Sequence, residues 1–221
     1  MDLSAFPYLQ GNYAPVTEER DFDESELRIE GKVPESLTGA FMRDGANVAY
    51  QPNHYVYPLD GDGMIHSVYF KDGHVQYKNR WVETNHLKTE RQFDRTIYGS
   101  VGKLLEVPQE VIDAGGEPNP VRNTANTNVI YHGGKLFALW EGGFPHLLNN
   151  DLSTVGLYDY DGALKPGDAL TAHPKVCPDT GQLITCTPVS YTHLRAHETI
   201  LPISYAVICL KRGGGGGGGG G

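Results

Sequence analysis

The chain has 221 residues and a formal net charge of −9, with 18 basic and 27 acidic residues. Its length fits one domain or a part of a larger one, and the acidic balance argues against a protein that binds nucleic acid by neutralising phosphates. No apolar stretch approaches the roughly 20 residues that span a bilayer, and Met1–Pro7 lacks a signal-peptide pattern, so we expect a cytoplasmic protein.

Short strands separated by glycine, aspartate and proline dominate residues 1–188, which predicts an all-β fold. Residues 34–39 read as a turn that leads into a strand. Strands at 67–70 and 75–77 flank Asp72 and Gly73, and this pair predicts a hairpin because Asp-Gly supplies the positive φ of a tight connection.

A second hairpin is predicted from strands at 128–132 and 135–140, joined by two glycines. A further strand is expected at 156–160, closed by an Asp-Gly turn. Between these hairpins, apolar residues in 100–113 predict a helical insertion that Pro108 interrupts. Repeated hairpins fit a sandwich, a barrel or the blades of a propeller, and the pattern alone does not choose among them.

Two residues have settings that suit a metal site. His173 precedes Pro174, which fixes the backbone just after the imidazole, so the ring could be held as a ligand. Glu141 ends an apolar strand and could accept a hydrogen bond from the far nitrogen of a metal-bound histidine; a solvent-facing acid is the alternative. Residues 60–66 resemble a calcium-loop fragment but lack the later acidic ligands, so a tight turn is favoured.

The segment 189–221 departs from the pattern of the preceding residues. Much of 189–211 can be read as codons of a transposase-type sequencing-library adapter, and the final nine glycines as repeated GGG. We therefore expect authentic sequence to end near Pro188, and 189–221 to be disordered and without function. A natural flexible tail is the alternative.

An ordered set of motifs resembles the carotenoid cleavage oxygenases, a family that also contains stilbene-cleaving dioxygenases. The resemblance covers residues 6–183. The motifs lie at 11–16, 31–39, 43–47, 60–66, 79–84, 125–129, 139–143 and 171–181. The sequence Arg-Asp-Gly-Ala-Asn at 43–47 departs from the family's usual Arg-Asn-Gly-Pro-Asn, and Cys177 stands where a polar residue is common.

The resemblance implies a seven-bladed β-propeller, of which 1–188 would be the incomplete N-terminal part. It implies Fe(2+) held on the propeller axis by four histidines. Of these ligands His173 is present in the chain, and the other three would lie outside it. Glu141 matches a glutamate that in the family supports one of the absent histidines.

The implied activity is that of an oxidoreductase that incorporates O2 across a carbon–carbon double bond, giving two carbonyl products. The implied substrate is an apolar carotenoid, apocarotenoid or stilbene. No protein partner is implied, and peripheral contact with a membrane stays open because no amphipathic segment marks it.

A metal-free propeller that acts as a scaffold or binding protein is the alternative, because a fold by itself does not prove chemistry. With one ligand of four, the chain as written is expected to be catalytically inactive.

Overall fold

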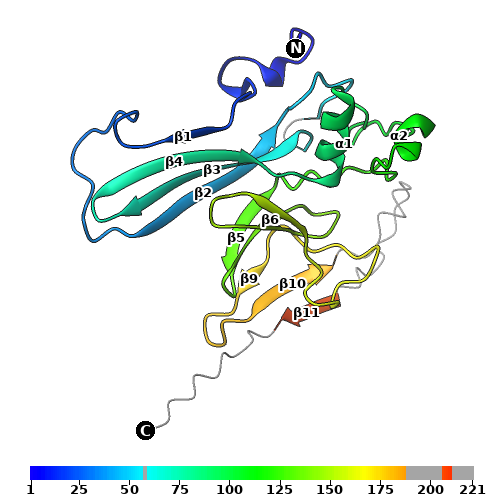
Figure 1. Cartoon of the computed structure of the whole chain (residues 1–221). Coiled ribbons are helices and arrows are strands. Elements are labelled where there is room, and N and C mark those ends of the chain that lie inside the picture. The colour runs from blue at the N-terminus through cyan, green and yellow to red at the C-terminus, as the bar shows by residue number, and fades with distance from the viewer. Residues whose placement is uncertain (57–58, 188–205, 211–221) are drawn as a thin grey trace, which may run out of the picture.

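The computed structural model describes residues 1–56, 59–187 and 206–210. Within these residues the strands form three antiparallel sheets that follow one another along the chain, in the orders β1-β4-β3-β2, β5-β6-β7-β8 and β9-β10-β11. Figure 1 shows the long first sheet on one side, the second sheet below it and the third beyond the second. The predicted all-β character is confirmed.

The first sheet contains the first predicted hairpin. Its strands are β1 (Arg20–Phe22), β2 (Gly39–Asn47), β3 (Asp62–Lys71) and β4 (His74–Trp81), preceded by short 3-10 turns at Pro7–Leu9 and Gly11–Tyr13. The turn between β3 and β4 has φ values of 52° at Asp72 and 80° at Gly73. Both residues adopt the left-handed conformation that a two-residue hairpin turn requires, as the sequence predicts.

The second sheet confirms the second hairpin and corrects the strand expected at 156–160. Its strands are β5 (Asn128–His132), β6 (Lys135–Leu139), β7 (His146–Leu148) and β8 (Thr154–Leu157). Strand β8 begins and ends earlier than predicted. Tyr160 and Asp161 have φ values of 55° and 56°, which lie outside the extended region and turn the chain away from the sheet.

Two helices lie together at one end of the first sheet (Figure 1). Helix α1 (Asn85–Phe93) was not predicted; it begins at Thr84, whose hydroxyl accepts a hydrogen bond from the Leu87 amide. The insertion expected at 100–113 is helical only in α2 (Gln109–Asp113), which begins directly after Pro108. A helix can start at a proline but is disrupted by one in its interior. No helix in the described residues has the length and apolar character needed to cross a membrane.

The third sheet is formed by β9 (Lys175–Val176), β10 (Leu183–Thr187) and β11 (Ala206–Leu210). Residues 188–205 and 211–221 lie outside the described residues. We expected no ordered structure after residue 188, whereas 206–210 pairs with β10. The adapter-like origin of 189–221 stays a prediction.

Strand β6 is the centre of the packing because both of its faces are buried. Leu136 and Ala138 point to a cluster shared with Ile65 and Val82 of the first-sheet region. Phe137 and Leu139 point to the opposite side. Alternate side chains of a strand face opposite sides, so β6 lies between two apolar layers.

The cluster on the far side of β6 determines where the candidate site lies. Leu164, Leu170 and Ala172 pack there against Phe137 and Leu139. This packing brings the segment before β9 alongside the end of β6.

Candidate functional site

The two residues predicted to belong to a metal site are in contact. His173 Nδ1 lies 2.7 Å from Glu141 Oε1, although 32 residues separate them in the sequence. Glu141 follows the end of β6, and His173 lies two residues before β9. The side chains are 64% and 40% exposed, so the pair lies at the surface of the described residues.

The loop that carries Glu141 is closely packed around its two glycines. A Cβ atom at Gly142 would come within 2.5 Å of the Trp140 ring, and one at Gly143 within 2.8 Å of the Asn123 amide nitrogen. The Leu170 amide donates to the Gly143 carbonyl at 3.1 Å, which ties this loop to the segment before His173. The lack of side chains at these glycines lets the loop pack against the Trp140 ring and the Asn123 amide.

The pair has the hydrogen-bonding chemistry of a metal ligand with its supporting carboxylate. A carboxylate is an acceptor, so Nδ1 is the donor in this contact, and in the neutral ring the lone pair of Nε2 is then available to a metal. Metal-binding histidines commonly donate their other N–H to a carboxylate in this way. By donor chemistry, the residues present fit one position of a metal site.

The described residues supply a part of such a site. They contain no group of three or more His, Cys, Asp or Glu side chains arranged to hold a metal ion. The resemblance assigns Glu141 to a histidine other than His173, whereas here the Glu141 carboxylate contacts His173 itself.

The other histidines before residue 189 have environments of their own. Five contact the Ser100 hydroxyl, the Tyr77 hydroxyl, Glu24, the Asn119 carbonyl and the Gly181 carbonyl; these are His54, His66, His74, His86 and His132, respectively. His146 is 2% exposed, and its Nδ1 has no hydrogen-bond partner among the described residues. Burial lowers the pKa of His146 to about 4, with smaller contributions from nearby Lys88 and His86.

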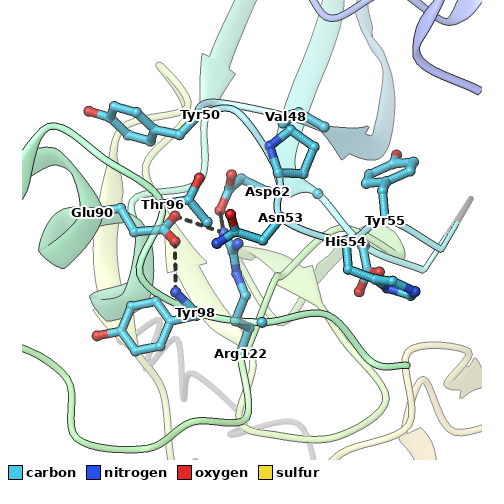
Figure 2. Close-up of a pocket in the computed structure, with 14 residues that line it drawn as sticks. Val48, Tyr50, Asn53, His54, Tyr55, Asp62, Glu90, Thr96, Tyr98 and Arg122 are labelled. Atoms are coloured by element: carbon cyan, nitrogen blue, oxygen red, sulfur yellow. Dashed lines mark hydrogen bonds and ion pairs between the residues drawn. The ribbon is translucent and has the colours of Figure 1, made fainter. Parts of the chain in front are cut away.

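A second cluster of charged residues lines a small pocket between the first sheet and α1. Figure 2 shows Arg122 between Asp62 and Glu90. Arg122 Nη2 contacts Asp62 Oδ1 closely and lies 3.2 Å from Glu90 Oε2. Glu90 also accepts hydrogen bonds from the amides of Ile97 and Tyr98. Burial raises the pKa of Glu90, and the Arg122 guanidinium opposes this rise.

This pocket is a structural feature and not a substrate site. Its free volume is about 20 Å³, which is room for about one water molecule. Asp60, in the segment that resembles a calcium loop, accepts hydrogen bonds from the backbone amides of Val56 and Val101. Sequence analysis missed the trio of Asp62, Glu90 and Arg122 because its members come from three distant segments with no common spacing.

Comparisons with known proteins agree on one family. Residues 13–213 match the family model described as retinal pigment epithelial membrane protein, RPE65. Carotenoid 9,10(9′,10′)-cleavage dioxygenase 1 of Phaseolus vulgaris is 37% identical over 216 residues, covering 89% of this chain and 37% of that protein. The chain thus spans little more than a third of this relative.

Solved structures give the same result. The lignostilbene dioxygenase of Pseudomonas brassicacearum superposes with a TM-score of 0.71 at 33% identity, covering 82% of this chain and 36% of that one. A cobalt-substituted Synechocystis apocarotenoid oxygenase has a TM-score of 0.64 at 30% identity, covering 80% and 38%.

Proposed function

The chain belongs to the RPE65 family of carotenoid cleavage oxygenases, and on this premise we propose that it is the N-terminal part of a dioxygenase with a β-propeller fold. The propeller fold follows from its structural neighbours, of which it covers a part. The observation that carries the proposed activity is the 2.7 Å contact between His173 and Glu141. It directs the Nδ1–H group of His173 to a carboxylate that follows the end of β6, so that Nε2 of the neutral ring is free to bind a metal.

The proposed reaction is oxidative cleavage of a carbon–carbon double bond. One molecule of O2 is consumed, the double bond is broken, and each of its carbons receives one oxygen atom as a carbonyl group. A carotenoid, an apocarotenoid or a stilbene is the proposed substrate class, supported by the names of the similar proteins.

Iron(II) is the proposed metal, and when bound it supplies the chemistry that activates O2. The cobalt-substituted relative supports a metal site in this family. In this chain His173 would offer Nε2 to the metal. Glu141 would accept the hydrogen bond from Nδ1–H, which fixes the orientation of the ring so that Nε2 faces the metal. The other ligands would come from parts of the protein beyond this chain.

The chain by itself is proposed to be inactive, because the candidate site has one imidazole, His173, and the described residues contain no cluster of three metal-binding side chains. Purified chain with Fe(II) should consume O2 no faster than Fe(II) alone. Faster uptake that depends on a carotenoid or stilbene substrate would overturn this part of the proposal.

The activity is tested on a longer protein. Long-read sequencing of the source DNA across the codons around Pro188 shows whether the coding sequence continues, and the longer protein is then expressed with Fe(II). We expect O2 consumption and two carbonyl products. His173→Ala should reduce the rate to background.

The matched control is His74→Ala. His74 Nδ1 also contacts a glutamate, Glu24, at 2.9 Å, but it lies at the first hairpin turn. This variant should keep wild-type activity. If both variants retain activity, His173 does not bind the metal of this reaction and its proposed role is wrong. If the longer protein with Fe(II) shows no O2 consumption at all, a metal-free binding propeller becomes the better account.

A further inference from the structure

We propose that Asn128 is a positioning residue for the Glu141–His173 pair, an inference that rests on the proposed role of this pair at a metal. Asn128 is the first residue of β5 and lies opposite Leu139, the last residue of β6. Its side-chain amide donates to the carbonyl oxygen of Ala172 at 2.8 Å. Asn128 therefore links β5, the strand paired with β6, to the residue that precedes His173.

A hydrogen bond to the Ala172 carbonyl directly affects the orientation of the His173 backbone. This carbonyl belongs to the peptide group that joins Ala172 to His173, and a peptide group is planar. Fixing the oxygen therefore fixes the plane from which the His173 backbone continues. Pro174 restricts the backbone of His173 from the other side. The ring is left with its side-chain torsions, and the contact with Glu141 selects among these.

The surroundings of this hydrogen bond favour a positioning role. The Ala172 side chain is fully buried in the cluster on β6, and Leu170 is 1% exposed in the same cluster. A second tie joins the Leu170 amide to the Gly143 carbonyl at 3.1 Å. Packing thus brings the segment to β6, and the amide of Asn128 orients its final peptide group. An aspartate at 128 has the same shape but presents oxygen where the donor is needed.

The test uses the full chain without metal. Asn128→Ala and Asn128→Asp are compared with wild type by ¹⁵N NMR of the His173 ring in alkaline solution, where imidazole is neutral. Wild type should carry its proton mainly on Nδ1. In both variants the displaced ring should lose its hydrogen bond to Glu141. The ratio of the Nδ1–H to the Nε2–H tautomer should then fall by about fivefold, the change expected for loss of that one hydrogen bond.

Asn126→Ala is the matched control. The Asn126 amide donates to the carbonyls of Leu59 and Gly61 at 3.2 and 2.9 Å, on the side of the first sheet. This variant should lower the stability of the fold while leaving the His173 tautomer ratio unchanged. An unchanged ratio in both Asn128 variants, or an equal shift in Asn126→Ala, would show that Asn128 has a general structural role and overturn the proposal.

A measurement on the wild-type chain protects the test against variants that do not fold. The side-chain amide of Asn128 should show a scalar coupling across the hydrogen bond to the carbonyl carbon of Ala172. Absence of this coupling in the folded chain would also overturn the proposal. Because neither readout needs metal or substrate, failure of the proposed dioxygenase activity would leave both results unaffected, and the two failures are distinguishable.

Discussion

Replacing Arg122 with methionine should destabilise the fold far more than the same replacement at a surface ion pair. The Arg122 side chain is 15% exposed, and its partners Asp62 and Glu90 are 4% and 1% exposed. Removing the guanidinium leaves two buried carboxylates without their cation. Breaking a buried ion pair from one side costs about 3–5 kcal/mol, a large fraction of the stability of an ordinary domain.

Arg95→Met is the control. Arg95 Nη2 lies 2.6 Å from Glu110 Oε1, but these side chains are 50% and 67% exposed. Exposed pairs of this kind contribute about 0–1 kcal/mol. The two arginines differ in burial and also in the number of carboxylates that they contact, two for Arg122 and one for Arg95, and both differences favour a larger loss at Arg122.

The assay is urea unfolding of the full chain at neutral pH, followed by the fluorescence of its two tryptophans. The free energy of unfolding should fall by about 3 kcal/mol or more for Arg122→Met and by less than about 1 kcal/mol for Arg95→Met. Lower pH should reduce the deficit of Arg122→Met, because protonation removes the unpaired charges. Equal losses in the two variants would refute the argument that burial makes this network essential.

Three further predictions concern stability. Burial lowers the pKa of His146 to about 4 in the folded state, against 6.5 normally. The wild-type free energy of unfolding should therefore fall by up to about 3 kcal/mol as the pH falls from 6.5 to 4. His146→Gln should lack this pH dependence, and parallel pH profiles of the two proteins would contradict the prediction. Gly63→Ala places a Cβ against the Ala125 carbonyl and should lower the free energy of unfolding by about 1–3 kcal/mol. Gly45→Ala has open space at its Cβ and should leave the melting temperature nearly unchanged. Similar melting temperatures of the two variants would contradict the clash at Gly63. Thr84→Ala removes the cap of α1 and should cost about 1 kcal/mol in urea unfolding, whereas no measurable loss would show that the cap is dispensable.

Local chemistry allowed the sequence to determine the hairpins. The Asp72-Gly73 and Gly133-Gly134 turns require positive φ, and their residues adopt it wherever the flanking strands pair. The sequence predicted the end of β8 and the position of α1 less well. Strand β8 ends at Leu157. Positive φ at Asp161 fits the predicted Asp-Gly turn, whereas positive φ at Tyr160 is uncommon for this residue type and was not predicted. Helix α1 has a weak apolar pattern, and packing on the first sheet supports it.

The residues of the candidate site were identified from the sequence, but their contact was not. The sequence identified His173 and Glu141 separately, from a proline after one and a strand end before the other. Their contact was decided by tertiary structure. The burial of β6 on both faces draws the segment before His173 onto Phe137 and Leu139, and this packing brings an imidazole and a carboxylate 32 residues apart to 2.7 Å.

The Arg122 network was beyond sequence analysis for a related reason. Asp62, Glu90 and Arg122 come from β3, from α1 and from the segment before β5, and no spacing in the chain relates them. Turn conformations depend on one or two neighbouring residues and can be read locally. Contacts between distant segments depend on how whole apolar faces pack, and so only the folded chain determines which polar groups meet.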